Sequence, residues 1–511
     1  MRTSDSAQIT TKAHSISVPS PMPSPSSEED THQVFFVGSG TGSPAFPREV
    51  TPILDNSWSG PAEYIDDCVF TSSVGKETSA PINCSAKYVA LTFERPLMTM
   101  PFNITAPQDQ HLLRHFIRVV SRTLSIVHDD DANPFLKLIV PLAGSSEVVM
   151  ESLLALSASH LRGVYPEILQ RGLAHQSKGT LILVVSCHLA LTSILALSFL
   201  NSIISKTIPS SAEQTLATVL LLCMIEICDG NSTKWSWHIS AAQTIIRSKS
   251  RSKSSSMTWK FLLAMFGYVD SVITISNCQA PLITLEELTN EGEPNASRDV
   301  NHRDAPYTLH SEALFGVAQP LFNIIGKISG LAHRRKERVD EISDIWFRQS
   351  AKSIEESLRV WEPPSLTSPL ERNRADISNA ANAIKWASIL RLHQVVDGYC
   401  LSDPCVRECT SNILTYVSRI RFGSSVESIL IFPLVMAAAG AADDEQRVCV
   451  KERWMVMERT IGFDNVARAR QMVEAVWKCV DNGRESGADE NGEAVNWAKI
   501  RYFDFPGVVL L

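Results

Sequence analysis

The sequence lacks a net positive charge and the cysteine spacing of common zinc sites. Its formal charge is −8 at pH 7, so no global basic field draws the chain to nucleic acid, and any DNA contact would be local. No two of its eleven cysteines stand at C-x2-C spacing, which disfavours structural zinc. Cysteines scattered over a long chain are typical of reduced thiols in the nucleus or the cytosol.

Motifs for catalysis and cofactor binding are also missing. The sequence contains no G-x-S-x-G motif, and the S-x-x-K motif at Ser73 stands alone. Residues 38–42 resemble a phosphate-binding loop only in their glycines, because no Lys-Ser/Thr pair and no helix follow them. We therefore expect no catalytic and no cofactor-binding residues and no enzymatic activity. A helical enzyme with an unrecognised pocket is the rival hypothesis.

Two kinds of residue pattern are candidates for a metal site. The cysteines follow helical spacing in Cys223-x4-Cys228 and in Cys400-x4-Cys405-x3-Cys409, which is more typical of small apolar core residues than of metal ligands. The pair His111 and His115 lacks the glutamate that a zinc protease places between its two histidines. We expect no metal-binding residues and interpret these histidines as partly exposed surface residues.

Residues 1–108 are predicted to form a disordered tail. This stretch is rich in proline and serine, and residues 19–27 read Pro-Ser-Pro-Met-Pro-Ser-Pro-Ser-Ser with three acidic residues following. Such a composition cannot bury enough apolar surface to offset the chain entropy lost on folding. The first residues contain no apolar run of signal-peptide length, so secretion is not expected.

From residue 109 to residue 511 the pattern predicts a large multi-helix domain, and the fold class is all-α. Apolar residues recur at intervals of three and four, and sustained period-two alternation is absent. Ser210 and Glu213 are predicted to form a capping box for a helix that ends at Asp229-Gly230. Polar stretches near 281–310 and 481–494 are predicted to be surface loops.

Residues 180–200 form the longest nearly uncharged stretch. About 20 apolar residues can span a bilayer, so a membrane-tethered helical protein is one alternative. The flanks carry only Lys178 and Lys206, without the basic loops and aromatic anchors of membrane helices. We favour a buried core helix or an anomaly in the gene structure and expect no membrane partner.

Two basic clusters are candidates for nuclear import or phosphate contact, although both also fit solvated loops and helix ends. Their cationic residues are Arg247, Lys249, Arg251 and Lys253 in the first cluster, and Arg334, Arg335, Lys336 and Arg338 in the second.

Several segments, in order along the chain, resemble the helical regulatory domain of fungal binuclear zinc-cluster transcription factors. The resemblance extends over about residues 111–503. The matching stretches are Ser121-Arg-Thr-Leu124, Asn133-Pro-Phe-Leu-Lys-Leu-Ile-Val-Pro-Leu142, Leu153-Leu-Ala-Leu-Ser-Ala-Ser-His-Leu161, Glu213-Gln-Thr-Leu-Ala-Thr-Val-Leu-Leu-Leu-Cys223, Glu226-Ile-Cys-Asp-Gly230, Trp237-His238, Trp361-Glu-Pro-Pro364, Glu427-Ser-Ile-Leu-Ile-Phe-Pro-Leu434 and Glu458-Arg-Thr-Ile-Gly-Phe-Asp-Asn465.

The resemblance implies a nuclear transcription regulator, encoded beside biosynthetic genes that it controls, with no catalytic residues. The family reads DNA with six N-terminal cysteines, whereas only Cys68 and Cys84 precede Cys187 here. Zinc is therefore expected only if a missing N-terminal cluster exists. The chain is expected to act through other regulators or self-association, and to reach DNA only indirectly or through a missing module.

Two alternatives concern the gene structure. A truncated gene model would lack a first exon that encodes the zinc cluster, and six ordered cysteines upstream would reveal it. Residues 180–193 look additional to the family pattern, and a translated intron would explain their length and their lack of a polar face. Target genes, the effector and the sign of regulation do not follow from these residues.

Overall fold

The computed structural model describes residues 104–192 except 128 and 164, and residues 211–249, 256–290, 307–364, 373–485 and 495–510. Within these ranges the chain forms helices joined by turns and no β-strand, which confirms the all-α fold class. The ranges belong to one unit, Thr92–Leu511. Most of the tail predicted over residues 1–108 lies outside them, and the first helix begins at Pro107.

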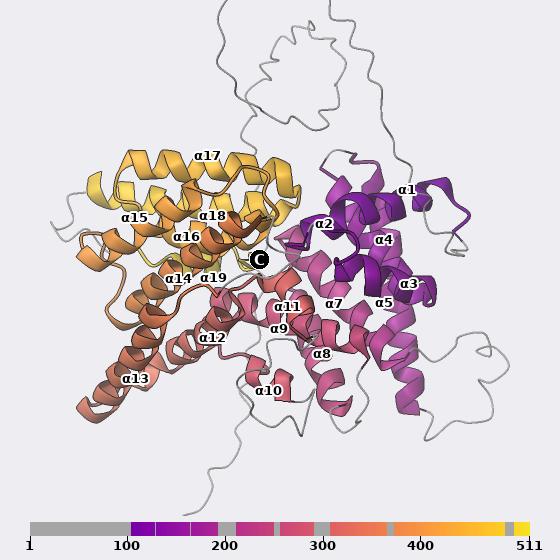
Figure 1. Ribbon diagram of the computed structural model, residues 1–511, viewed down its shortest axis with the longest axis horizontal. Helices are drawn as coiled ribbons and strands as arrows, with labels where there is room; N and C mark the ends of the chain where they lie inside the picture. Colours follow the sequence, from indigo (N-terminus) through magenta and orange to yellow (C-terminus); the bar gives the residue numbers. More distant parts are fainter. Residues whose placement is uncertain are drawn as a thin grey trace, which may run out of the picture. The chain divides into compact units, whose positions relative to one another are not determined.

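The helices of the first half run from α1 to α9 and include two π-helical turns (Figure 1). Their bounds are α1 Pro107–His115, η1 Phe116–Val120, α2 Ser121–Thr123, η2 Phe135–Ile139, α3 Val140–Gly144, α4 Glu147–Leu161, α5 Ile168–Thr192, α7 Ala212–Asp229, α8 Trp235–Lys249 and α9 Met257–Asn277.

The second half begins with the short helix α10 and contains two 3-10 turns, η3 and η5. Its bounds are α10 Leu285–Asn290, α11 Tyr307–Phe315, α12 Gln319–His333, η3 Arg334–Glu337, α13 Glu341–Val360, α14 Arg374–Val396, α15 Pro404–Ser418, η5 Ser425–Ile429, α16 Ile431–Gly440, α17 Asp444–Ile461, α18 Asp464–Glu485 and α19 Trp497–Asp504.

The predicted capping box of α7 is displaced by one residue. Ser211, not Ser210, is the N-cap, and its side chain accepts a hydrogen bond from the backbone of Gln214 at 3.2 Å. The Gln214 side chain accepts the Ser211 backbone N–H in return, so glutamine completes the box instead of Glu213. The helix ends as predicted, with Gly230 in the left-handed conformation at φ 71°.

The two predicted polar loops are partly helical. Residues 285–290 form α10, and α11 begins at residue 307, so the loop predicted near 281–310 was wrong at both of its ends. Helix α18 likewise continues to Glu485 through the start of the predicted loop 481–494. Residues 291–306 and 486–494 lie outside the described residues.

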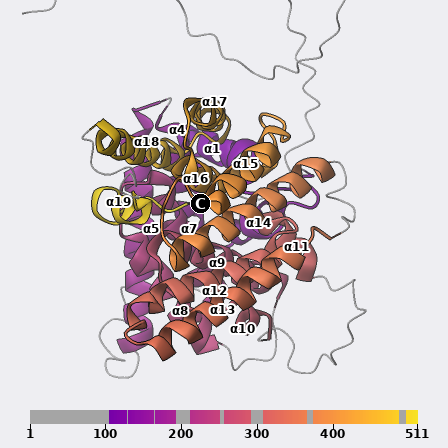
Figure 2. The ribbon, with the colours of Figure 1, turned by 90° about the vertical axis from the view of Figure 1, so that its left-hand side faces the viewer.

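Helix α9 is the central core element. Both views place it among the other helices, and it contacts α7, α8, α10, α11, α12 and α19 (Figure 1, Figure 2). Among the described residues it is the one helix long and apolar enough to cross a membrane, but 83% of its apolar window is buried, as in a core helix. The stretch 180–200 continues α5 as far as Thr192, and the rest lies outside the described residues.

A buried ion pair joins three elements of the second half, η5, α15 and α17. Arg453 of α17 and Glu427 of η5 lie 2.9 Å apart, with side chains only 4% and 2% exposed. Arg453 also donates to the carbonyl oxygens of Val417 and Ile420, while Glu427 accepts the hydroxyl proton of Thr460 at 2.6 Å. Each charge is therefore fully satisfied, and removal of either one leaves the other uncompensated in the core.

A chain of two histidines joins α1, α4 and the end of α17. His115 Nε2 lies 3.0 Å from His160 Nδ1, and His160 Nε2 lies 3.0 Å from the carbonyl oxygen of Ile461. Because His160 donates to that carbonyl, its neutral Nδ1 accepts the His115 proton. Burial, followed by the proximity of His160 and His111, lowers the pKa of His115 to about 4. His115 is half-buried and His111 is exposed, so both are partly exposed as expected, but His115 is also engaged by His160.

Replacement of the buried carboxylate is expected to destabilise the fold strongly. Glu427→Gln leaves the Arg453 charge unpaired and should lower the free energy of unfolding by about 3 kcal/mol. The control Asp131→Asn removes an exposed partner of Lys137 and should cost less than about 1 kcal/mol. Urea denaturation followed by circular dichroism measures both, and equal losses would contradict the assignment of Glu427 as a core charge.

The histidine chain makes stability depend on pH. Between pH 6.5 and pH 4.5 the unfolded chain binds a proton at residue 115 that the folded chain does not bind. The free energy of unfolding therefore decreases as the pH is lowered. Over this interval, the free energy of unfolding should fall by about 2 kcal/mol more in the wild type than in His115→Gln. His111→Gln, at the exposed position of the same helix, should follow the wild type; parallel curves for all three proteins would refute this explanation.

Candidate functional site

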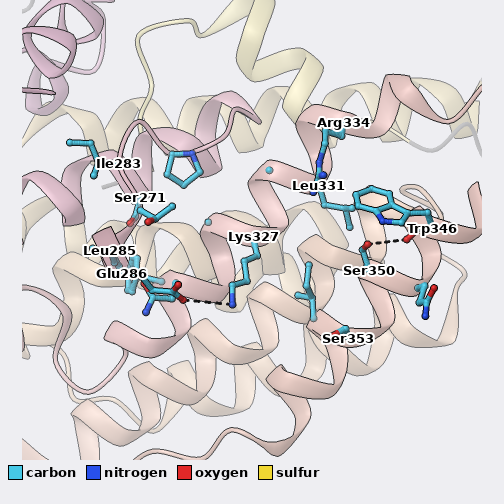
Figure 3. Close-up of a pocket in the computed structure, with 18 residues that line it drawn as sticks. Ser271, Ile283, Leu285, Glu286, Lys327, Leu331, Arg334, Trp346, Ser350 and Ser353 are labelled. Carbon is cyan, nitrogen blue, oxygen red and sulfur yellow. Dashed lines mark hydrogen bonds and ion pairs between the residues drawn. The ribbon is translucent and has the colours of Figure 1, made fainter. Parts of the chain in front are cut away.

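A trough lies between α12, α13 and the segment 281–286, with a volume of about 720 Å³ (Figure 3). Phe322 and Leu331 of α12 and Ile354 of α13 contribute apolar side chains to its lining. This volume is in the range of pockets that bind small molecules or anchoring side chains. The trough is therefore the candidate binding site among the described residues.

Two glycines shape the α12 side of the trough. At Gly326 an added Cβ would lie 3.0 Å from Cγ of Pro281, so the absence of a side chain lets the segment 281–286 approach the helix. At Gly330 an added Cβ would meet nothing within 4 Å. Gly330 therefore opens the trough, and a large side chain at this position would fill it.

A buried carboxylate of α9 positions the segment 281–286, which forms the wall of the trough opposite α12. Asp270 Oδ2 accepts the backbone N–H groups of Leu282 at 2.8 Å and of Ile283 at 3.3 Å. Burial raises the pKa of Asp270 to about 7, because the apolar core disfavours its charged form. Thr284 and Glu287 form a capping box directly after these residues, which fixes the start of α10.

The rim of the trough is polar and carries more positive than negative side chains. Lys327 pairs with Glu286 at 3.8 Å, with both side chains largely exposed. The Arg334 guanidinium lies 4.5 Å from the ring centroid of Trp346, which is a cation–π contact across the end of the trough. Lys327 and Arg334 are the cations of the lining and Glu286 is its carboxylate, so the rim favours an acidic ligand.

Large apolar side chains are exposed beside the trough, at the start of α13. Val339 is 82% exposed, Ile342 80%, Ile345 57% and Trp346 46%. The last three lie on one helix whose N-cap, Asp340, accepts the Ser343 backbone N–H at 2.7 Å. A cluster of exposed apolar residues next to a polar rim is typical of a surface that contacts another protein.

The structure separates the second basic cluster into exposed and bound cations. Arg334, Arg335 and Lys336 are exposed on the η3 turn at the end of the trough. Arg338, in contrast, has two protein partners. It pairs with Asp344 at 2.5 Å and donates a hydrogen bond to the carbonyl oxygen of Val396.

Both described cations of the first basic cluster have partners, although Arg247 is exposed. Arg247 donates to the carbonyl oxygen of Leu282 at 3.2 Å. Lys249 lies 3.6 Å from Glu213 and 3.9 Å from the centroid of the Trp259 ring. Arg251 and Lys253 lie outside the described residues.

The candidate metal ligands do not gather into a site. In the described ranges no three His, Cys, Asp or Glu side chains are arranged to hold a metal ion. Cys223 and Cys228 are buried in the core, as their helical spacing indicated. The trough could not be predicted from the sequence. The glycines at 326 and 330 are its one local signal, since the remaining lining residues meet only in the folded chain.

Comparisons with known proteins identify the domain. Over 282 residues the chain is 24% identical to an uncharacterized transcriptional regulatory protein of Schizosaccharomyces pombe, which covers 53% of this chain. The chain spans about half the length of this curated relative. No solved structure matches the chain. The model of the fungal specific transcription factor domain matches residues 111–502. The chain therefore belongs to the fungal specific transcription factor domain family.

Proposed function

We propose that this chain is a nuclear regulator that acts through a protein partner, and that the trough binds an acidic amphipathic helix of another transcription regulator. Membership in the family supports the regulatory role. The single observation that carries the proposal is the trough with its exposed apolar margin on α13.

The shape and chemistry of the trough suit a helix. Gly330 lets another backbone approach α12 closely, and the open space there can receive a large apolar anchor. Ile342, Ile345 and Trp346 extend the apolar surface beyond the cavity, and helices bind such grooves through anchors one turn apart. A buried aromatic or aliphatic anchor supplies most of the binding free energy in interfaces of this kind.

The positive charges around the trough favour an acidic partner helix. Lys327 and Arg334 line the trough, and Arg335 and Lys336 are exposed next to it. Acidic residues at the ends of a bound helix would pair with these cations and raise its association rate. Self-association through the same surface is the second candidate, and it predicts a change in oligomeric state when the trough is filled. Control of a biosynthetic gene cluster stays a prediction.

Filling the trough should abolish regulation without disturbing the fold. With the full chain fused to an unrelated DNA-binding domain at a reporter promoter, Gly330→Trp should reduce the effect on transcription about tenfold, as expected from a loss of about 1.4 kcal/mol in partner binding. The control Gly330→Ala leaves the cavity open and should act as the wild type. Both variants replace a helical glycine by a residue of higher helix propensity, so this backbone effect does not separate them.

Three results would contradict this proposal in different ways. A wild-type fusion that leaves the reporter unchanged would refute regulation by the chain. Equal reporter effects of Gly330→Trp and Gly330→Ala would show that the trough is not used. A dimeric wild type that becomes monomeric with Gly330→Trp would assign the trough to self-association.

Nuclear import is expected to depend on the exposed cations of η3. The double variant Arg335→Gln/Lys336→Gln should lose most of its nuclear accumulation as a fluorescent fusion, because import receptors need unpaired basic side chains. The comparison variant Arg251→Gln/Lys253→Gln changes the other basic cluster and should stay nuclear. The reverse pattern would assign import to the first cluster, and cytoplasmic wild type would refute the nuclear proposal.

A further inference from the structure

Two cysteines and a histidine meet where α14 and α15 pack together. Cys405 and Cys409 lie one turn apart on α15, with their sulfur atoms 4.0 Å apart. Cys409 is completely buried, whereas Cys405 is partly exposed. His393 of α14 lies next to this pair, close enough to lower the pKa of the Cys405 thiol, with its ring nitrogens 3.3 Å from Asp397 and Asp403. One accessible sulfur atom is thus placed beside one that solvent does not reach.

The surroundings of Cys405 favour its thiolate. It is the second residue of α15, where the helix dipole stabilises negative charge. Hydrogen bonds from Cys409 and from His393 lower the pKa of Cys405, while the neighbouring thiolate and burial raise the pKa of Cys409. Hydrogen bonding to Cys405 in turn raises the pKa of His393 to about 8, which keeps the imidazole protonated at neutral pH.

Other charged groups reach this cluster from three sides. His393 lies 3.3 Å from Asp397 at the end of α14 and 3.3 Å from Asp403, which is the N-cap of α15. Arg359 of α13 adds a second positive charge close to Cys405 and Glu408. The aspartates hold the imidazolium in place, as a carboxylate holds the histidine of a catalytic pair. Arg359 offsets part of their negative charge at the sulfur.

We propose that Cys405 and Cys409 form a peroxide-sensitive thiol switch, in which Cys405 reacts with a hydroperoxide and Cys409 resolves the product. The Cys405 thiolate attacks one peroxide oxygen, the O–O bond breaks, and the leaving oxygen takes a proton from His393. Cys405 becomes a sulfenic acid. The Cys409 thiol then attacks that sulfur, its proton leaves with the hydroxyl as water, and a disulfide forms. The two thiols lose two electrons, which the peroxide accepts.

The disulfide would change the start of α15. Residues four apart on a helix have Cβ atoms about 5–6 Å apart, whereas a disulfide needs about 3.5–4.5 Å. The first turn must therefore tighten or unwind, and the cap in which Asp403 accepts the Cys405 backbone N–H at 2.7 Å would be lost. Strain of this kind makes a disulfide easier to reduce, so a dithiol reductant would restore the helix.

Peptide mapping of the full chain tests the switch directly. Trypsin cleaves after Arg391, Arg407 and Arg419, so the two sulfurs fall in peptides 392–407 and 408–419. After equimolar hydrogen peroxide and alkylation, these peptides should appear cross-linked, and a dithiol should separate them. Cys400 shares the first peptide and is exposed, so Cys400→Ser must keep the cross-link.

Kinetics separate the role of His393 from a structural one. His393→Gln should slow the reaction of Cys405 with peroxide about tenfold at pH 7, with the difference disappearing near pH 9, where the thiol ionises without help. Cys449, exposed on α17, serves as the internal reference and should react at the same rate in both proteins.

Each remaining outcome overturns the proposal. Oxidation of Cys449 or Cys400 before Cys405 would show that Cys405 is not the sensitive thiol. Sulfinic acid at Cys405 without a cross-link would show that Cys409 does not resolve it. In the wild type, a cross-link of peptide 392–407 to a peptide other than 408–419 would assign the disulfide to another cysteine, and this result requires no variant.

Discussion

Helix α9 buries nearly every side chain from Trp259 to Ser276, so it needs neighbours on all of its faces. Helices of both halves supply them: α7 and α8 come from the first half, while α11, α12 and α19 come from the second. The hydrophobic effect thus ties segments more than 200 residues apart in the sequence into one core. The trough, the buried ion pair and the cysteine cluster are all built on helices that this core holds in place.

The few polar groups of α9 and its C-terminal end determine how the outer segments are attached. Asp270 holds residues 282–283, which form one wall of the trough. Ser276 Oγ accepts the backbone N–H of Leu510 at 3.0 Å, and Asn277 accepts a hydrogen bond from Arg501 at 2.5 Å. A buried polar group is tolerated only with a partner, so each of these groups specifies one attachment and excludes others. The same helix therefore positions the binding surface and the last residues described.

Local sequence patterns predicted part of this fold. In α8, for example, Trp235, Ile239, Ala242 and Ile246 are buried, and their spacing of three and four residues marks the helix face that meets the core. Helix α9 has no polar face, so periodicity could not reveal its central role. The cap of α7 was displaced by one residue, since serines at 210 and 211 both offer a hydroxyl and only the tertiary fold selects between them.

The sites were harder to predict than the helices. The trough joins three segments that meet only in the folded chain, and the cysteine cluster needs a histidine from a second helix. Helical spacing placed Cys405 and Cys409 one turn apart on α15, but the expectation of core cysteines was wrong for Cys400, which precedes the helix and is exposed.

Because α9 is enclosed by other helices, truncated fragments of the protein are poorly suited to mapping its function. Any fragment that ends between α9 and α12 would expose apolar faces of this 21-residue helix and would aggregate or be degraded in the cell. Deletion series and two-hybrid fragments cut within this region would therefore report loss of solubility and not loss of a binding surface. Point substitutions in an otherwise intact chain are the appropriate tool for mapping its contacts.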